Sequence, residues 1–450
     1  MIDLKNISQV YFIGIGGIGM SALARYFYNE GKDVSGYDKT PSAITNELQE
    51  LGIAVHFEDR GSLVTRDFPN QDTTLVVYTP AVPDSFGELV RFRESGYLFK
   101  KRAEVLGLIA NSSFAMAVAG THGKTTTSSI LGHILAETQA PVTAFIGGIT
   151  TNYNSNLIHN GNQVIVVEAD EFDRSFLQLE PKIACITSMD PDHLDIYENQ
   201  EDFENTFKAF ASKVSHKNLF IKNGLPLEGN TVGIGDDALY SAQNISITNG
   251  HYVFDFKHPD GVVEKMQFNL PGWHNLFNAV TALGMAMAYG TPSELLPKAL
   301  RSYEGVNRRF TYRITSDDLI LIDDYAHHPT EIAAVHQSVR EMYPEETVMA
   351  IFQPHLFSRT QDFLDDFANE LSHFDEVVLL DIYPARELPI AGITSQLILD
   401  KITSDKKLLV SKDNLREVVH NSIHGVIVMM GAGDIGVEVL KVTESIVNAN

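Results

Sequence analysis

Cysteine is nearly missing from this chain of 450 residues, which contains only Cys185. A disulfide within the chain is therefore excluded, and this usage is typical of proteins from a reducing compartment. Cys185 lies in the apolar run 182–187, so we expect a buried structural residue and not a nucleophile. We expect the protein to act in the cytoplasm.

Cations are also scarce, because 34 lysine and arginine residues stand against 58 aspartate and glutamate residues, a net charge of −24. A nucleic-acid surface needs clustered cations, so this balance argues against DNA or RNA as a partner. Long apolar runs are absent too, and we expect neither a membrane-spanning segment nor a secretory signal. The remaining composition, 44% apolar and 20% charged, is ordinary for a globular protein of two or three domains.

A glycine-rich stretch, Gly-Thr-His-Gly-Lys-Thr-Thr-Thr at 120–127, follows an apolar segment that predicts a buried strand over 113–119. The sequence after it predicts a helix over 128–137. Backbone N–H groups at such a turn bind phosphate, Lys124 adds a mobile charge, and Thr125 offers a hydroxyl to the Mg²⁺ of ATP. Valine replaces the first glycine of the standard pattern, so we expect a shorter or differently bent loop. We predict an ATP phosphate site; a glycine turn with a surface lysine is the alternative.

A second glycine loop, Gly-Ile-Gly-Gly-Ile-Gly at 14–19, lies between an expected strand over 10–13 and an expected helix over 20–30. Asp38 follows at the spacing of an acid that binds a ribose hydroxyl. The loop would place N–H groups on a pyrophosphate, which suits a dinucleotide or a UDP-sugar. A turn needed only for tight packing is the alternative.

Strands and helices alternate along the chain, which predicts an α/β protein with parallel sheets. An expected strand over 74–78 ends in a loop that begins at Thr79, where ligands of open α/β sheets bind. An expected helix over 101–110 then leads to the middle of the chain.

Carboxylates cluster after the apolar segment 163–167, at Glu168, Asp170, Glu171 and Asp173. Such a cluster needs a cation or solvent to offset its repulsion, and Glu168 is the best Mg²⁺ ligand among the four. A solvated acidic turn explains the other three at least as well. His193, after an expected strand over 183–187, is a candidate for a second metal, and an ordinary surface or core histidine is an equal alternative.

Amide side chains open an expected helix rich in alanine and methionine, where His274, Asn275 and Asn278 fall within one turn. Amides both donate to and accept from a base edge, so these residues are candidates for contact with a nucleotide; helix capping is a serious alternative for Asn275. Arg309 is a candidate to clamp a phosphate or carboxylate, against the alternative of a surface arginine.

Four further strands are expected in the last third, at 319–322, 348–352, 377–380 and 426–430. Each ends in a polar or glycine-rich loop, and one cleft would gather such loops. The last loop, 431–436, repeats the pattern G-x-G-x-x-G without a following strand and acid. We therefore expect it to have a structural or phosphate-facing role.

These motifs together resemble the Mur ligases of bacterial cell-wall synthesis. The matching stretches occur in the family's order at 12–20, 120–127, 168–171, 192–193, 274–278, 308–310, 324–329 and 353–355. The resemblance implies a Rossmann-like N-terminal domain over 1–110 for a UDP-sugar, a central P-loop-type ATPase domain over 111–312, and a C-terminal Rossmann-like α/β domain over 313–450 for an amino acid.

The resemblance also implies the reaction, in the branch of the family that adds L-alanine to UDP-N-acetylmuramate. ATP would phosphorylate the lactyl carboxylate of the sugar, and the amine of alanine would attack the acyl phosphate. Lys124, His327 and Arg359 would be catalytic, with Arg359 matching the carboxylate of alanine. We expect closure of the domains around the ligands, and a monomer or weak homodimer.

The resemblance also implies which residues contact ATP, the other substrates and Mg²⁺. ATP would contact Gly120, Thr121, His122, Gly123, Lys124, Thr125, Thr126, His274, Asn275, Asn278 and Arg309. The other substrates would contact Gly16, Gly17, Gly19, Met20, Asp38, Thr79, Tyr325, His327, His355 and Arg359. Mg²⁺ would bind Thr125, Glu168 and His193.

Other functions compete with this interpretation. The first glycine loop alone fits an NAD-dependent oxidoreductase, which leaves the Gly-Lys-Thr loop and Glu168 unexplained. A non-catalytic nucleotide-binding regulator is a third possibility. Within the family, the ligase that attaches a recycled peptide to the same sugar is the runner-up. The sequence leaves open whether Lys208 is modified and whether alanine, serine or glycine is preferred.

Overall fold

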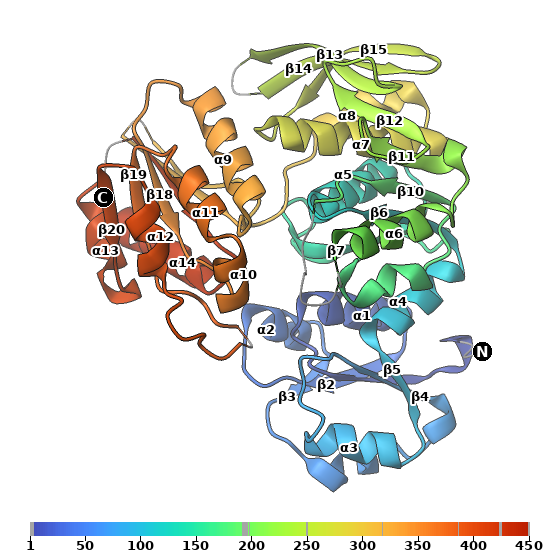
Figure 1. Cartoon of the computed structure of the whole chain (residues 1–450). Helices are drawn as coiled ribbons and strands as arrows, with labels where there is room; N and C mark the ends of the chain where they lie inside the picture. The colour runs from blue at the N-terminus through green and yellow to red at the C-terminus, as the bar shows by residue number, and fades with distance from the viewer. Residues whose placement is uncertain are drawn as a thin grey trace. The chain divides into compact units, whose positions relative to one another are not determined.

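The computed structural model describes residues 4–190, 197, 199–248, 251–316, 318–385, 387–422 and 425–448. These residues form three sheets that are flanked by helices (Figure 1). They group into two compact units: Met1–Gln243, Asp255–Met266 and Asn278–Tyr303 form the first, and Asn244–Phe254, Gln267–Phe277 and Glu304–Asn450 form the second. The predicted α/β class, with three Rossmann-like or P-loop-type regions, is confirmed.

The first sheet has the strand order β3-β2-β1-β4-β5, and all its neighbouring strands are parallel. Its strands are β1 (Gln9–Ile13), β2 (Asp33–Tyr37), β3 (Ala54–His56), β4 (Thr74–Tyr78) and β5 (Leu98–Lys101). Its helices are α1 (Ile18–Asn29), α2 (Ala43–Glu50), α3 (Gly87–Glu94) and α4 (Arg102–Asn111). The order reverses between β1 and β4, so their carboxyl ends form the switch point where such sheets bind ligands.

The second sheet has the order β15-β14-β13-β12-β11-β10-β6-β9-β7-β8. Its strands are β6 (Phe114–Ala119), β7 (Val142–Thr150), β8 (Ser155–His159), β9 (Val164–Glu168), β10 (Ile183–Ile186), β11 (Leu219–Lys222), β12 (Asn230–Ile234), β13 (Tyr240–Thr248), β14 (His251–His258) and β15 (Gly261–Phe268). Its helices are α5 (Lys124–Glu137), α6 (Gln200–Ala211), α7 (Trp273–Tyr289) and α8 (Leu296–Arg301). Because β6 pairs in parallel with both β9 and β10, the loops that follow these three strands meet at one edge.

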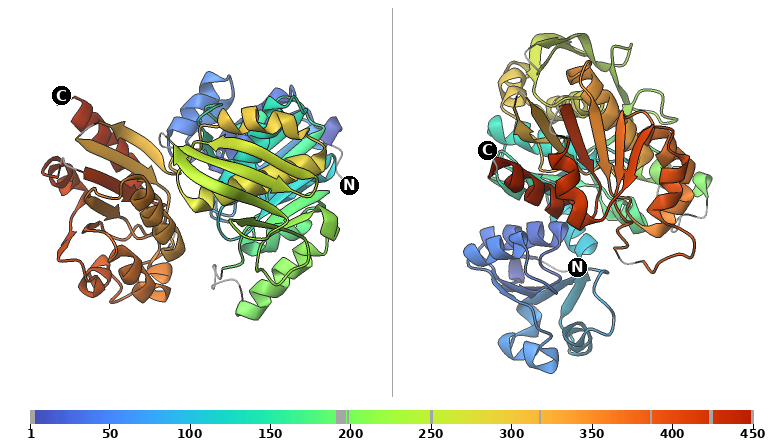
Figure 2. Two further views of the ribbon diagram at one scale, coloured as in Figure 1. Left: turned by 90° about the horizontal axis from the view of Figure 1, so that it is seen from above. Right: turned by 90° about the vertical axis from the view of Figure 1, so that its left-hand side faces the viewer.

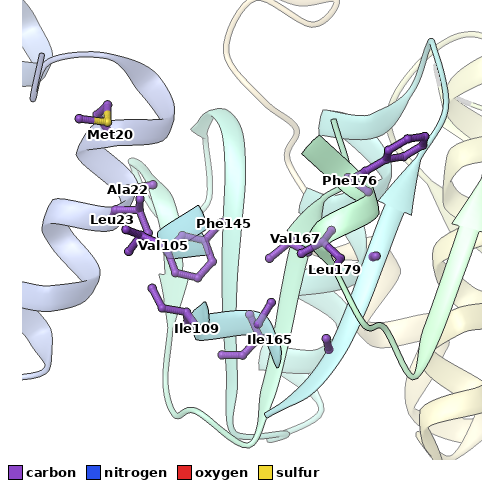
Figure 3. Packing of buried hydrophobic residues seen from close by; sticks show 14 of the residues in the cluster. Met20, Ala22, Leu23, Val105, Ile109, Phe145, Ile165, Val167, Phe176 and Leu179 are labelled. Atoms are coloured by element: carbon purple, nitrogen blue, oxygen red, sulfur yellow. The ribbon is translucent and has the colours of Figure 1, made fainter. Parts of the chain in front are cut away.

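One hydrophobic core runs through the first and second sheets. Buried side chains of α1, α4 and β7 pack together, as Figure 3 shows for Leu23, Val105, Ile109 and Phe145. The same cluster continues to Val167 at the end of β9. Burial of this apolar surface is the main force that holds α1 and α4 on the second sheet.

The third sheet has the order β16-β17-β21-β18-β19-β20, with β16 antiparallel and the others parallel. Its strands are β16 (Thr311–Thr315), β17 (Leu319–Asp324), β18 (Val348–Phe352), β19 (Glu376–Leu379), β20 (Lys406–Leu409) and β21 (Gly425–Met430). Its helices are α9 (Pro329–Met342), α10 (Phe357–Asp362), α11 (Leu364–Leu371), α12 (Ser395–Lys401), α13 (Lys412–His420) and α14 (Ile435–Val447), and they cover both faces (Figure 2). The apolar core is accordingly split into a cluster on each face of this sheet.

One predicted helix boundary was wrong, and several strands were not predicted. The helix after the phosphate loop begins at Lys124 and not at Ser128, because Gly123 turns the chain with φ +84° and the three threonines already lie in the helix. The edge strands β5, β16 and β20 were missed, since each is short and carries few apolar residues. The strands β7, β8 and β11–β15 of the second sheet were missed as well. No helix in the part of the chain that the structure describes is long and apolar enough to cross a membrane.

Candidate active site

The phosphate loop follows β6 in the middle of the second sheet, and its glycines are required by its shape. Gly120 and Gly123 have φ values of +131° and +84°, which residues other than glycine rarely adopt. A Cβ atom at Gly123 would lie 2.5 Å from Oδ1 of Asn278, and one at Gly120 would collide with Oγ1 of Thr187. The loop therefore packs closely against Asn278 and the strand end at Thr187.

Lys124 begins α5 and is held by a buried carboxylate. Its Nζ lies 2.9 and 2.8 Å from the two carboxylate oxygens of Glu171, and it also donates to the carbonyl of Gly120 at 2.7 Å. Burial acts to lower the pKa of Lys124, but the charges of Glu171 and Asp170 outweigh it and raise the pKa. Lys124 therefore stays an ammonium group, and it has to exchange Glu171 for any phosphate that enters the loop.

A solvated acidic turn was an alternative for Glu171, and the structure excludes it for this residue. Its side chain is only 1% exposed because it lies under the loop as the partner of Lys124. Asp170 remains partly exposed and faces Arg102 at 3.8 Å. The side chain of Asp173 lies outside the described residues.

Hard oxygen atoms gather around Glu168 at the carboxyl end of β9. Its carboxylate accepts hydrogen bonds from Oγ1 of Thr125 at 3.2 Å, Oγ of Ser128 at 3.2 Å and the backbone N–H of Gly147 at 2.6 Å. A carboxylate beside a threonine hydroxyl, next to a phosphate loop, is the donor set that Mg²⁺ takes in nucleotide sites. Thr125 and Glu168 thus fit a shared ion, whereas His193 lies outside the described residues.

The remaining loop residues are fixed by the loop that follows β10. The hydroxyl of Thr121 donates to the carbonyl of Asp190 at 2.7 Å, and the N–H of His122 donates to Oγ of Ser188 at 2.8 Å. Thr126 is buried within the first turn of α5. The N–H groups of Thr121 and His122 are thus used within the protein, and phosphate is offered the N–H groups at the start of α5 and the ammonium group of Lys124.

The amide residues of α7 have different surroundings. Asn275 is buried, and its Nδ2 donates to the carbonyl of Pro271 at 2.6 Å, so it stabilises the turn that precedes the helix. Asn278 is also buried and lies against Gly123 of the phosphate loop. His274 is exposed. This geometry gives Asn275 a structural role inside the first turn of α7, although not as the N-cap residue, and it favours a contact near the nucleotide for Asn278.

The first glycine loop lies at the switch point of the first sheet. The carboxylate of Asp38 accepts a hydrogen bond from the N–H of Gly16 at 2.7 Å. A Cβ atom at Gly14 would lie 2.6 Å from Cγ2 of Thr79, so the loops after β1 and β4 are adjacent. Gly17 is exposed at this edge, while the Met20 side chain is buried in the core, so a ligand could meet Met20 only through its backbone.

In the second unit, two cations lie against the ring of Tyr325. The guanidinium carbons of Arg308 and Arg309 lie 5.0 and 5.1 Å from the centre of its ring. Arg308 also forms an ion pair with buried Asp323 at 3.3 Å, which is a structural role. Burial raises the pKa of the neighbouring Asp324 to about 6, although the charge of Arg309 and two backbone N–H groups oppose the shift.

His327 follows β17 and is held in one tautomer. Its Nδ1 lies 3.0 Å from the carbonyl oxygen of Tyr325 and 3.1 Å from the carboxylate of Glu331. Both partners are acceptors, so Nδ1 carries the hydrogen and Nε2 is the nitrogen that accepts a proton. Burial lowers the pKa of His327, and nearby Arg359 contributes to that lowering, so the ring is neutral near pH 7.

The structure brings the predicted residues of the third sheet together. The rings of Tyr325 and His327 are 5.4 Å apart, and those of His327 and His355 are 6.2 Å apart. His355 stacks on Tyr383 with ring centres 5.7 Å apart, and Arg359 is buried in α10. The loops after β17, β18 and β19 thus share one edge, as expected of neighbouring parallel strands.

The second pattern G-x-G-x-x-G, at 431–436, has a structural role. The first N–H of α14, at Ile435, donates to Oε1 of Gln353 at 3.0 Å, and Nε2 of Gln353 donates to Asp434 at 2.8 Å. A Cβ atom at Gly436 would lie 2.6 Å from the guanidinium group of Arg308. Protein groups thus occupy the helix N-terminus that a phosphate would need.

Sequence reasoning missed four residues of these sites, namely Arg102, Ser128, Gly147 and Glu331, and it did not predict that Glu171 of the acidic cluster pairs with Lys124. None of the four lies in a motif of unusual composition, so their roles depend on pairing between distant segments. Glu331 alone had a local signal, because His328 and Glu331 form a capping box at the start of α9. Lys208, left open above, forms a helical ion pair with Glu204 at 3.9 Å.

Comparison with known proteins covers nearly the whole chain. Residues 9–114 match the model described as "Mur ligase family, catalytic domain", residues 118–286 match "Mur ligase middle domain", and residues 308–433 match "Mur ligase, glutamate ligase domain". The first and third segments contain the first and third sheets, and the middle segment contains the second sheet except for most of β6.

Whole-length relatives agree with these matches. The chain is 60% identical over 446 residues to a protein of Flavobacterium psychrophilum named UDP-N-acetylmuramate–L-alanine ligase, with 99% of each chain covered. A protein of Flavobacterium johnsoniae with the same name is 58% identical, with 100% of each chain covered. The crystal structure of the UDP-N-acetylmuramate-alanine ligase of Thermotoga maritima superposes with a TM-score of 0.83 at 27% identity, over 98% of this chain and 100% of that one.

Proposed function

Since this chain belongs to the Mur ligase family, we propose that it joins L-alanine to UDP-N-acetylmuramate with hydrolysis of ATP, in the synthesis of peptidoglycan. The observation that carries the proposal is the identity of up to 60% with relatives named for that reaction, over 99% of the chain. The products are the alanine amide of the UDP-sugar, ADP and phosphate.

The first chemical step needs two anions to meet. The lactyl carboxylate attacks the γ-phosphorus of ATP, the bond to the bridging oxygen of ADP breaks, and an acyl phosphate forms. Lys124 and the backbone N–H groups at the start of α5 bind the phosphates and offset the charge that develops in the transition state. The arrangement of Lys124 at the start of α5 supports this role.

Mg²⁺ belongs to this proposal as the ion that accompanies ATP. Thr125 and Glu168 would hold it, since their oxygen atoms lie 3.2 Å apart beside the phosphate loop. When bound, the ion neutralises charge on the phosphates and on the carboxylate that attacks them. The role proposed for His193 as a second ligand stays a prediction.

The second step is attack of the amine of alanine on the acyl carbon, with loss of phosphate. Alanine is an ammonium ion at neutral pH and has to lose a proton before it can attack. His327 is suited to take it, because Nδ1 is committed to Tyr325 and Glu331 and the neutral ring accepts at Nε2. We assign the alanine carboxylate to Arg359, whose planar fork matches it.

The test is phosphate release by the purified chain with ATP and MgCl₂. Release is expected only when UDP-N-acetylmuramate and L-alanine are both present, and mass spectrometry of the nucleotide product should show addition of one alanine residue. Serine and glycine in place of alanine measure selectivity. Release without an amino acid, or stoichiometric NAD in the purified protein, would overturn the proposal.

A further inference from the structure

Arg102 lies against the last glycine of the first glycine loop. A Cβ atom built on Gly19 would lie 2.8 Å from Nη1 and 3.3 Å from the guanidinium carbon of Arg102. Gly19 is not at a positive φ, so its backbone does not require glycine. The guanidinium group occupies the space that a side chain at position 19 would take.

Packing fixes the position of Arg102. It is the first residue of α4, and Val105 and Ile109 continue the same helical stripe into the core beside Leu23 of α1 (Figure 3). Asn156 of β8 donates hydrogen bonds to the carbonyl of Ile18 at 2.6 Å, so the start of α1 is also tied to the second sheet. The packing of α4 in the core therefore holds the guanidinium group against the first glycine loop.

Electrostatic repulsion destabilises the Arg102 cation at this position when no anionic ligand is bound. A cation at the first residue of α4 opposes the positive end of the helix dipole, and the start of α1 adds a second positive end beside Gly19. The ion-pair partner of Arg102 is Asp170, whose oxygen is 3.8 Å away, too long for a hydrogen bond. Both side chains of that pair are partly exposed, at 32% and 41%.

We propose that Arg102 is a further substrate-binding residue, which binds an oxyanion of the UDP-sugar at the first glycine loop and exchanges Asp170 for it. This inference rests on the proposed function, because it takes that loop as the site of the UDP-sugar. Two groups of UDP-N-acetylmuramate offer the required chemistry, the pyrophosphate and the lactyl carboxylate. A planar guanidinium binds either through paired hydrogen bonds.

The test is calorimetric titration of the full chain, without ATP, with UDP, UDP-N-acetylglucosamine and UDP-N-acetylmuramate. Arg102→Gln should weaken binding by about 10-fold to 100-fold, the effect of one charged hydrogen-bonding pair, and Arg102→Lys should weaken it less. Loss with all three nucleotides assigns the pyrophosphate, and loss with UDP-N-acetylmuramate alone assigns the carboxylate. Arg93→Gln is the matched control, since it removes an arginine paired with Asp84 at 2.9 Å on the surface of the same sheet, and binding should not change.

Two further variants distinguish a ligand-binding role of Arg102 from a purely structural ion pair with Asp170. Asp170→Asn removes the competing charge, so it should leave affinity for the nucleotides unchanged or tighten it. Gly19→Ala keeps every charge but displaces the guanidinium group, so it should weaken binding as Arg102→Gln does. Wild-type affinity in Arg102→Gln, or an equal loss in Asp170→Asn, would overturn the inference. Failure of the wild-type chain to bind UDP-N-acetylmuramate would instead overturn the proposed function.

Discussion

At the scale of single residues, the lysine of the phosphate loop already has an anionic partner in the protein. Glu171 contacts Lys124 with both oxygens, and the pair is almost entirely shielded from water, with side-chain exposures of 1% and 17%. A buried ion pair contributes little net stability, but loss of one partner leaves a buried charge behind. Replacement of Lys124, which the reaction needs, should therefore also destabilise the fold around the loop.

Lys124→Met should lose both turnover and stability. Because Glu171 is left buried without its partner, we expect a loss of roughly 3–5 kcal/mol in the free energy of unfolding. The double variant Lys124→Met with Glu171→Gln should recover most of that stability and none of the activity. Urea unfolding and phosphate release check the two parts.

The control for this pair is binding of UDP-N-acetylmuramate, which should stay close to the wild-type value in the double variant. The loop proposed to bind the UDP-sugar follows β1 and is separate from the phosphate loop, which follows β6. Equal destabilisation of the single and the double variant would contradict the assignment of Glu171.

The two buried asparagines of α7 should separate structure from binding. Asn275→Ala removes the hydrogen bond to Pro271 and leaves its carbonyl buried, so we expect a loss of about 1–3 kcal/mol in the free energy of unfolding. Asn278→Ala should instead raise the KM for ATP, because Asn278 faces the phosphate loop. Thermal unfolding and ATP titrations of both variants provide the comparison, and a raised KM for ATP confined to Asn275→Ala would reverse the two roles.

At the scale of elements, a polar network anchors the helix that follows the phosphate loop. The two ring nitrogens of His133 in α5 lie 3.0 Å from the hydroxyl of Tyr153 and 3.0 Å from that of Ser302. Ser129, one turn earlier, is hydrogen-bonded to the hydroxyl of Tyr303. The segment after α8 is thereby fixed to the back of α5.

This network should make stability depend on pH. Burial lowers the pKa of His133 in the folded chain, so the unfolded chain takes up the proton first as the pH falls. Its contribution is fully present above about pH 6.5, the ordinary value for histidine, and is lost as the pH drops toward the folded pKa. We expect wild-type protein to lose more unfolding free energy between pH 8 and pH 5 than His133→Gln does.

A matched control is His216→Gln, which removes a histidine whose side chain is 68% exposed and lies outside the His133 network. Identical pH profiles for wild type and His133→Gln would show that the buried ring does not act in this way.

Local sequence was sufficient to predict those elements that have strong periodicity and glycine turns. The strand β4 was predicted at its observed bounds, and the glycines at 14, 16 and 120 mark loops that the structure places at sheet edges. The pairing of Lys124 with Glu171, and of Gly19 with Arg102, could not be predicted, since each joins segments distant in sequence. The edge strand β16 was missed because one exposed face leaves it without a clear apolar pattern.

At the scale of the whole molecule, every substrate proposed here is an anion or carries a carboxylate, while the chain has a net charge of −24. Long-range repulsion then slows encounter, and local donors bind the ligand once it arrives. Salt screens the long-range part, with a Debye length of about 10 Å at 0.1 M.

The association rate of UDP-N-acetylmuramate should therefore rise several-fold when ionic strength increases from about 10 to 100 mM, since the Debye length falls from about 30 Å to 10 Å. Stopped-flow fluorescence at a series of salt concentrations measures it. A rate that falls with salt would mean that a local positive field at the site outweighs the net charge.

The core shared by the first two sheets has a consequence for how the chain folds during synthesis. Leu23 and Val105 lie against Phe145, and the same cluster includes Ile221. These residues are synthesised in that order. The N-terminal segment therefore leaves the ribosome with apolar side chains exposed, before β7 and the later strands that cover them have been made. Nascent chains halted near residue 110 should therefore recruit chaperones, and release from them should coincide with the appearance of β7 and the strands that follow it.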